Sequence, residues 1–262
     1  MAGIITLTTD FGLSDPYVGA MKGVILSVNA GARIVDITHL VGACNIVEGA
    51  LRMAHACPYF PDGTVHIGVV DPGVGGRRRP ILVETARHFF VGPDNGIFGP
   101  VIESGDVKRV IHLTEKRYFH EPVSATFHGR DIFSPVAARL CLGEPPSSFG
   151  PEIGDPATLD LPSPQRRGDE VRGVVLYIDS FGNYITNISR EDISHLKGRA
   201  VEVRLGDAAI EGLAKTYSDV APGELTALFG STGLLEVAES GGDAFKTIRE
   251  GSGAAVTVRP LP

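Results

Sequence analysis

The chain contains the stretch Val69-Val70-Asp71-Pro72-Gly73-Val74-Gly75-Gly76-Arg77-Arg78-Arg79, in which an apolar, strand-like run ends in a glycine-rich turn. This turn places the carboxylate of Asp71 and the guanidinium of Arg78 together at the end of a strand. Ligands of α/β proteins bind outside the carboxyl ends of strands, in loops that carry function. The pair is therefore a candidate site, although a tight turn with a solvated basic run would give the same pattern.

Residues 4–142 show the alternation of strands and helices that predicts an α/β domain. Short β-branched runs alternate with amphipathic helical patterns, as in βαβ units with a largely parallel sheet. The first helix is expected to begin at Pro16, with Ser14 or Asp15 as its cap, and two further helices are expected over roughly 46–57 and 130–142. The predicted strands are 4–9, 33–38, 64–70, 80–84, 88–91 and 108–113.

The second half of the chain has a different pattern. Residues 143–170 are rich in Pro, Ser and charged residues, so we expect a linker with neither a helix nor a central strand. Short strands separated by Gly, Asp and Pro turns then predict a small antiparallel β-barrel; they are 171–179, 183–188, 199–206, 208–213, 224–229, 233–238 and 254–259. The predicted domains are therefore an α/β domain over 1–165, which the resemblance given below implies to be catalytic, and a β-barrel domain over 171–262.

Composition limits the kinds of ligand. The chain has 262 residues, of which 43% are hydrophobic, and a formal net charge of −7. The length favours two domains, and the charge lacks the basic excess of a nucleic-acid binder. A small, mostly neutral ligand or a cation fits this composition better.

The cysteines and the beginning of the chain predict a compartment. Cys44, Cys57 and Cys141 are odd in number, form no CxxC and lie in apolar helical contexts, so buried reduced thiols are expected, without a disulfide. The chain opens on a strand-like run, and no apolar run approaches membrane-spanning length. We therefore expect a cytoplasmic protein without a membrane partner.

Two further clusters in the first half contain candidate functional residues. Asp10, in Thr8-Thr9-Asp10-Phe11-Gly12, follows the first strand, where a carboxylate can accept hydrogen bonds from the vicinal diol of a ribose. The alternative is an Asx turn. His128 precedes the third helix, whose dipole opposes protonation and so favours a neutral base. The alternative is a hydrogen-bonded structural histidine, and the other histidines show no metal-ligand spacing, so no metal is expected.

Two stretches in the second half are weaker candidates. Residues 177–187 present Asp179, Phe181 and Asn183, which suit an ammonium group, a stacked ring and a base edge, although a hairpin turn explains them equally. Residues 230–236 and 240–243 are rich in small side chains, which allow backbone amides to approach a ligand but also describe two β-turns.

Taken together and in this order, the blocks 8–12, 70–78, 92–96, 127–131 and 179–187 resemble the S-adenosylmethionine (SAM) hydroxide adenosyltransferases, hydrolase relatives of the fluorinases and chlorinases. The resemblance covers nearly the whole chain. It implies hydrolysis of SAM, as the substrate and without a cofactor, to adenosine and L-methionine, with a role in clearing the (R)-sulfonium form. It also implies a homotrimer with active sites between subunits.

The resemblance implies a role for each candidate residue. Asp71, Arg78 and His128 would be catalytic, and Asp10 would bind the ribose hydroxyls. The adenine would contact Asn183 and the backbone near Ser240 and Gly241. The pocket walls would be Phe127, Phe181 and Tyr217, and the methionine end would be held by Asp179, Ser231 and Glu236.

The chain departs from the halogenase pattern in ways that favour water over halide. His128-Gly129 stands where fluorinases have Tyr-Ser, Cys44 where they have Trp, and Thr232 where they have Arg. The long fluorinase insertion is also missing. Because the sulfonium is a built-in leaving group, only the water needs help, and either His128 or Asp71 would accept its proton. The alternatives are a halide-dependent adenosyltransferase and a non-catalytic SAM or nucleoside-binding protein.

Overall fold

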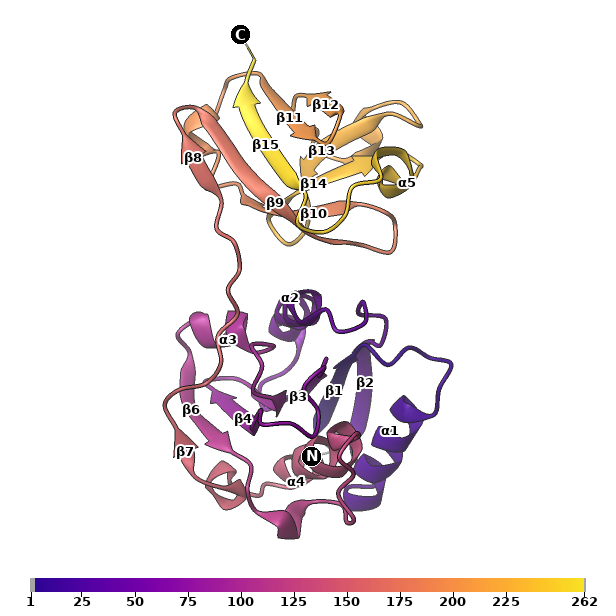
Figure 1. Cartoon of the computed structure of the whole chain (residues 1–262), viewed down its shortest axis with the longest axis vertical. Coiled ribbons are helices and arrows are strands. Elements are labelled where there is room, and N and C mark those ends of the chain that lie inside the picture. The colour runs from indigo at the N-terminus through magenta and orange to yellow at the C-terminus, as the bar shows by residue number, and fades with distance from the viewer. Residues whose placement is uncertain (1–2, 262) are drawn as a thin grey trace. The chain divides into compact units, whose positions relative to one another are not determined.

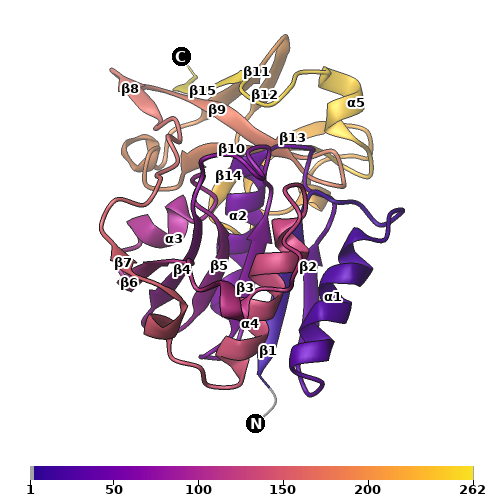
Figure 2. The same cartoon turned by 60° about the horizontal axis from the view of Figure 1, so that its bottom comes forward.

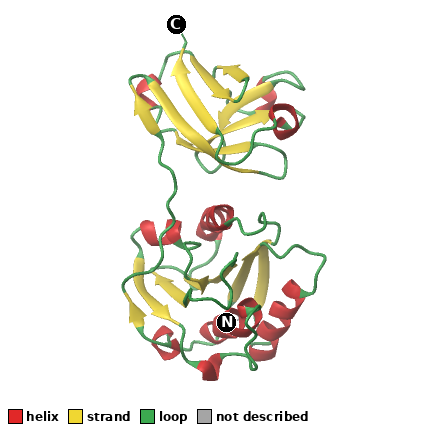
Figure 3. Cartoon of the chain, in the orientation of Figure 1, coloured by secondary structure: helices red, strands yellow, loops and turns green. Residues whose placement is uncertain are grey.

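The computed structural model describes residues 3–261 (Figure 1). The chain divides into two compact units, Met1–Asp160 and Leu161–Pro262. The first unit combines helices with strands, and the second consists mainly of strands (Figure 3).

The first unit is built on a seven-stranded sheet of order β2-β1-β3-β5-β4-β6-β7. Its strands are β1 (Ile4–Thr9), β2 (Arg33–Thr38), β3 (Val65–Val69), β4 (Pro80–Thr85), β5 (Phe89–Pro93), β6 (Val107–His112) and β7 (Glu152–Ile153). β2, β1, β3 and β5 are parallel, whereas β4 is antiparallel to β5 and β6, and β7 is antiparallel to β6. The short connection 86–88 allows only a hairpin between β4 and β5. The predicted α/β fold with a largely parallel sheet is confirmed, with β4 and the edge strand β7 reversed.

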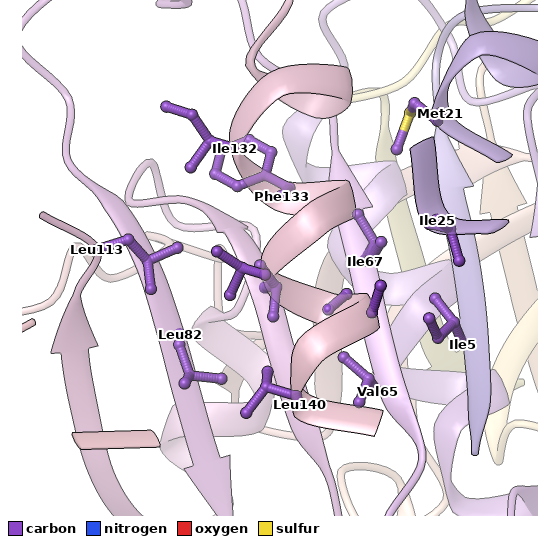
Figure 4. Packing of buried hydrophobic residues seen from close by; sticks show 14 of the residues in the cluster. Ile5, Met21, Ile25, Val65, Ile67, Leu82, Leu113, Ile132, Phe133 and Leu140 are labelled. Atoms are coloured by element: carbon purple, nitrogen blue, oxygen red, sulfur yellow. The ribbon is translucent and has the colours of Figure 1, made fainter. Parts of the chain in front are cut away.

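Helices cover both faces of this sheet, a division that can be followed in Figure 2. α1 (Tyr17–Val28) and α4 (Ser134–Cys141) pack on one face, where Met21 and Ile25 of α1 meet Ile67 of β3 (Figure 4). α2 (Ile46–Ala56) and α3 (Gly99–Glu103) pack on the other face. Alternate residues of β4 contribute to opposite clusters, as the two-residue period of a strand requires.

Short helical segments complete the first unit. A π-helical stretch, Gly129–Phe133, runs directly into α4, so the helix predicted over 130–142 begins with a wider turn. Pro16 occupies the cap position of α1, and no side chain caps this helix, contrary to the expected cap at Ser14 or Asp15. The 3-10 segments of this unit are Cys57–Tyr59, Lys116–Tyr118 and Pro146–Phe149.

The second unit is an antiparallel sheet of order β12-β11-β15-β9-β10-β14-β13, with β8 paired to β9. The strands are β8 (Gln165–Arg167), β9 (Glu170–Ile178), β10 (Tyr184–Ser189), β11 (Val201–Leu205), β12 (Ala208–Glu211), β13 (Leu225–Phe229), β14 (Leu234–Glu239) and β15 (Ala255–Pro260). A bridge between Ala214 and Leu228 brings the chain after β12 to β13, so the sheet nearly closes around its apolar core. This confirms the predicted barrel-like fold. The unit also contains α5 (Ala244–Ile248) and the 3-10 segments Ser194–Leu196 and Tyr217–Asp219.

Two local expectations are wrong. The linker was expected to contain no helix, but Pro146–Phe149 forms a 3-10 turn, because proline fits the first turn of a helix. Its strands β7 and β8 lie at sheet edges, where a proline-rich stretch can still pair. The cysteines were predicted to be buried, but only Cys57 is; Cys141 is partly buried, and Cys44 is exposed with a φ of 60° in the turn before α2, whose cap is Asn45. In residues 3–261 no helix is both long and apolar enough to cross a membrane.

Candidate active site

The parallel strands β1 and β3 bring two acidic residues to one edge of the sheet. Thr9 and Val69, the last residues of these strands, are paired in register. Asp10 follows Thr9, and Asp71 follows Val69 after one further residue. Because neighbouring parallel strands end at the same edge, both carboxylates extend from it.

Arg78 links Asp71 to His128. Its Nε atom lies 3.0 Å from each carboxylate oxygen of Asp71, and its Nη2 atom donates to Oδ2 at 2.5 Å. The same Nη2 atom lies 2.7 Å from His128 Nδ1. The side chains of Arg78 and Asp71 are only 9% and 4% exposed, so this ion pair is shielded from water.

The contact with Arg78 determines the tautomer of His128. A guanidinium has only N–H donors, so Nδ1 of His128 accepts and the proton of the neutral ring lies on Nε2. Burial, followed by the charge of Arg78, lowers the pKa of His128, while Asp71 and Asp131 act in the opposite direction. The ring is therefore mostly neutral at pH 7, and burial and Arg78 are the causes.

A pocket of about 300 Å³ lies beside this cluster. Its polar lining includes Asp10, Asp71 and His128, and its aromatic lining is Phe11, Tyr17 and Phe127. The three rings meet edge to face, with centroids 5.4 to 5.8 Å apart. Apolar walls with a few converging polar groups are typical of a small-molecule site.

The loop that carries Phe127 and His128 is held by a buried carboxylate. Asp131 is fully buried, and its Oδ2 atom accepts from the backbone N–H of Ser124 at 2.8 Å. The Arg130 guanidinium pairs with Asp131 and lies over the ring of Phe127, 5.0 Å from its centroid. These contacts fix the loop at the start of the π-helical stretch.

In the second unit, Asp179 organises the loop between β9 and β10. Its Oδ1 atom accepts from the backbone N–H groups of Phe181 and Asn183, and its Oδ2 atom accepts from Asn183 Nδ2 at 3.0 Å. Asn183 is buried, whereas the Phe181 ring is 74% exposed. The loop therefore presents an aromatic face beside a fixed amide.

Glu236 and Tyr217 form a second polar pair in this unit. The hydroxyl of Tyr217 donates to Glu236 Oε2 at 2.5 Å. Burial raises the pKa of Glu236, and the charge of Asp179 raises it further. The pKa of Tyr217 is also raised, first by burial and then by the carboxylate of Glu236. Asp179 and Glu236 are thus close enough to repel each other.

The remaining predicted site residues lie in turns of the second unit. Ser231 is exposed in the turn before β14, and Gly241 is exposed with a φ of 64°. Ser240 is buried, and its hydroxyl donates to the carbonyl of Val220 at 3.3 Å.

The structure therefore groups Asp10, Asp71, Arg78, Phe127 and His128 around one pocket of the first unit. Asp179, Phe181, Asn183, Tyr217, Ser231, Glu236, Ser240 and Gly241 belong to the second unit.

Three histidines of the first unit lie apart from this pocket. His39, His66 and His88 are buried in the interior of the unit. Within the described range 3–261, no group of three or more His, Cys, Asp or Glu side chains is arranged to hold a metal ion.

Comparison with known proteins identifies the family. The model of the SAM hydroxide adenosyltransferase N-terminal domain matches residues 5–150, and that of the C-terminal domain matches residues 173–257. The chain belongs to the SAM hydroxide adenosyltransferase family.

Individual relatives support this membership. A Salinispora tropica protein named (R)-S-adenosyl-L-methionine hydrolase is 41% identical over 92% of this chain and 91% of its own length. A fluorinase from Nocardia brasiliensis is more distant, at 26% identity over 90% of each chain. The crystal structure of an uncharacterized conserved protein from Thermotoga maritima superposes with a TM-score of 0.91 at 36% identity, covering 98% of this chain and 99% of the other.

Some pocket residues of this SAM hydroxide adenosyltransferase family member had no predicted role. Phe11 lies within the Asp10 block and Tyr17 is the first residue of α1, but neither position has a sequence signal for a pocket wall. The backbone N–H of Cys44 donates to Asp10 Oδ2 at 2.9 Å. A backbone contact between residues so distant in sequence has no signature in side-chain type, so sequence reasoning could not find it.

Proposed function

We propose that the protein hydrolyses S-adenosyl-L-methionine, with preference for the (R)-sulfonium form, to adenosine and L-methionine. The observation that carries this proposal is the Asp71–Arg78–His128 cluster beside the pocket of the first unit. Family membership and the name of the Salinispora tropica relative support the substrate and its epimer.

The reaction displaces methionine from the 5′-carbon of the nucleoside. A water oxygen forms a bond to the 5′-carbon as the carbon–sulfur bond breaks, and the electron pair of that bond neutralises the sulfonium. One proton of the water passes to a base. The leaving group needs no acid and the reaction needs no cofactor, so catalysis consists of activating and placing the water.

Asp71 is the base that the hydrogen bonds favour. Nδ1 of His128 already accepts from Arg78, and its Nε2 carries the proton, so the neutral ring has no free lone pair for water. A carboxylate has about four acceptor positions, so Asp71 retains acceptor capacity beside its contacts with Arg78. His128 Nε2–H then donates to the oxygen of the water, and Arg78 stabilises the developing hydroxide.

The substrate contacts follow from the two groups of residues. Asp10 would bind the ribose diol through its Oδ1 atom, since Oδ2 accepts from Cys44, and Phe127 would contact the nucleoside. Asn183, Phe181 and the backbone at Ser240 and Gly241 would bind the adenine. Asp179, Tyr217, Ser231 and Glu236 would bind the methionine end, whose ammonium group suits an acidic surface.

We further propose a homotrimer in which the second unit of one subunit completes the pocket of its neighbour. The division of the candidate residues between two units supports this assembly. Light scattering coupled to activity measurement tests it, and a fully active monomer would refute it.

Halide-dependent transfer is the competing reaction. Halide binding requires donors that replace its water shell, whereas a neutral water enters a polar pocket at much lower desolvation cost. The neutral His128 and the side-chain-free Gly129 favour water.

The test is to incubate the protein with (R)- and (S)-SAM in oxygen-18 water, with and without chloride. We expect labelled adenosine, faster from the (R) form, at a rate little changed by chloride. A 5′-chloro nucleoside as the main product would instead establish the halide reaction, and no product at all would leave only a binding protein.

A further inference from the structure

The dipeptide Asp94-Asn95, which begins at the carboxyl end of β5, contacts both ends of the catalytic loop 71–78. Asn95 Nδ2 donates to the carbonyl of Val70, the residue before Asp71, at 2.8 Å. Asp94 Oδ2 accepts from Nε of Arg79, the residue after Arg78, at 2.7 Å. One dipeptide therefore holds the residues immediately before and after the loop.

The backbone of the loop forms few hydrogen bonds of its own. Its centre, Gly73–Gly76, contains three glycines, and its internal turn contacts are Val74 N–H to the Asp71 carbonyl and Gly76 N–H to the Gly73 carbonyl. Glycine-rich backbone has more conformational freedom than any other. The approach of Asp71 to Arg78 therefore depends on where the two ends of the loop are fixed.

The side chains of the dipeptide also form hydrogen bonds with other segments of the first unit. Asp94 is buried, its Oδ1 atom accepts from the N–H of Ala157 at 2.7 Å, and its backbone N–H donates to the Arg79 carbonyl. Asn95 Oδ1 accepts from the N–H of Ile97 at 3.2 Å. These side chains thus act on the loop and on the segment leading to residue 160, and they do not line the pocket.

We propose that Asp94 and Asn95 are positioning residues for the hydrolysis, because they hold Asp71 and Arg78 at the separation that lets Arg78 reach His128. This inference rests on the proposed function for its kinetic consequence. A displacement of about 1 Å at a reacting group is enough to reduce a rate on the order of 100-fold.

Three variants test the proposal. Asn95→Asp replaces the donor to Val70 by an acceptor while keeping the contact with Ile97. Asp94→Asn weakens the pairing with Arg79. Asp155→Asn is the matched control, because Asp155 contacts the same guanidinium from an exposed position, with a side chain 81% exposed.

The first readout is the kinetics of SAM hydrolysis. We expect kcat to fall on the order of 10- to 100-fold in Asn95→Asp and Asp94→Asn, with KM changed less than about twofold, because misplacement affects the chemical step. Asp155→Asn should retain wild-type kcat. A kcat unchanged in both dipeptide variants, or reduced only in proportion to the folded fraction, would overturn the proposal.

The second readout is the titration of His128 by nuclear magnetic resonance, which does not require activity. His128 faces Arg78, Asp71 and Asp131, and Arg78 is the cation that lowers its pKa. When the loop ends are released, the lowering that comes from Arg78 should be lost, so the pKa of His128 should rise, although the larger lowering by burial remains. An unchanged His128 pKa in both variants would contradict the positioning role even if the wild-type protein fails to hydrolyse SAM. If either variant does not fold, Arg79→Lys replaces it in the test, because it keeps the positive charge but loses the guanidinium group that pairs with Asp94.

Discussion

The pocket of the first unit and the acidic pair of the second unit, Asp179 and Glu236, both contain carboxylates. The two sites differ in whether a neighbouring cation balances the negative charge. In the first, Asp71 is paired with Arg78, and the same guanidinium contacts His128. In the second, burial raises the pKa of Glu236, and the nearby charge of Asp179 raises it further, while the hydrogen bond from Tyr217 acts in the opposite direction. A compensated cluster suits the activation of a neutral water, whereas an uncompensated acidic pair suits a cationic ligand. This difference supports the proposal that the first unit carries out the chemistry and the second recognises the methionine end.

The largest expected effect separates chemistry from binding. Asp71→Asn and His128→Ala should each reduce kcat on the order of 100- to 10,000-fold, because they remove groups that act on the water. Adenosine affinity, measured by calorimetry, should remain within a few-fold of wild type. Equal losses of affinity and turnover in both variants would show that the first unit recognises the nucleoside and does not activate water.

The second effect is acid sensitivity of the first unit. Burial lowers the pKa of His66 from 6.5 to about 3, so the unfolded chain binds a proton that the folded chain excludes. Stability should therefore decrease as pH falls from 6.5 towards 3, by up to about 1.4 kcal/mol per pH unit. The free energy of unfolding, measured with denaturant, should depend on pH with this slope in the wild type and with a smaller slope in His66→Gln. His195→Gln is the control in the second unit. Equal slopes in wild type and His66→Gln would contradict the assignment.

The acidic pair should make substrate binding, measured as KM, depend on pH. Because the pKa of Glu236 is raised, Glu236 ionises only above its ordinary range, and ionisation creates the charge that attracts an ammonium group. KM for SAM should therefore decrease as pH rises through that raised pKa. Glu236→Gln should remove this dependence and raise KM at the higher pH by about 10-fold, as expected for the loss of an ion pair of roughly 1.4 kcal/mol. The exposed Glu211→Gln is the control, and a KM profile identical in wild type and Glu236→Gln would break the comparison.

The smallest effect concerns the residue next to His128. A methyl group at Gly129 would lie 3.2 Å from Met21 Sδ and 3.5 Å from the Phe127 ring. The thioether of Met21 can move by the few tenths of an ångström required. Gly129→Ala should therefore change the free energy of unfolding by less than about 1 kcal/mol and leave the product as adenosine. Chlorinated product from this variant would show that the side-chain-free position is what excludes halide.

The sequence by itself indicated most of the long elements and their order, because two-residue and 3.6-residue periodicities are local properties. It did not predict the short elements α3, α5, β7 and β8. It placed β1, β2 and β3 within a residue of their observed bounds and separated the α/β part from the barrel-like part. It also placed Asp10 and Asp71 at strand ends, since an apolar run followed by a polar turn marks where a strand stops. The sequence stretches that resemble the SAM hydroxide adenosyltransferases predicted the reaction.

Only the tertiary structure decided which groups meet and in which protonation state. Arg78 and His128 are 50 residues apart, and their contact sets the histidine tautomer on which the proposal of Asp71 as the base rests. Tyr217 pairs with Glu236, and Asp94 with Arg79, through hydrogen bonds between distant segments. The exposure of Cys44 likewise depends on the turn that precedes α2. Partner choice and burial are properties of the folded chain, because both arise from contacts between residues that no local pattern relates.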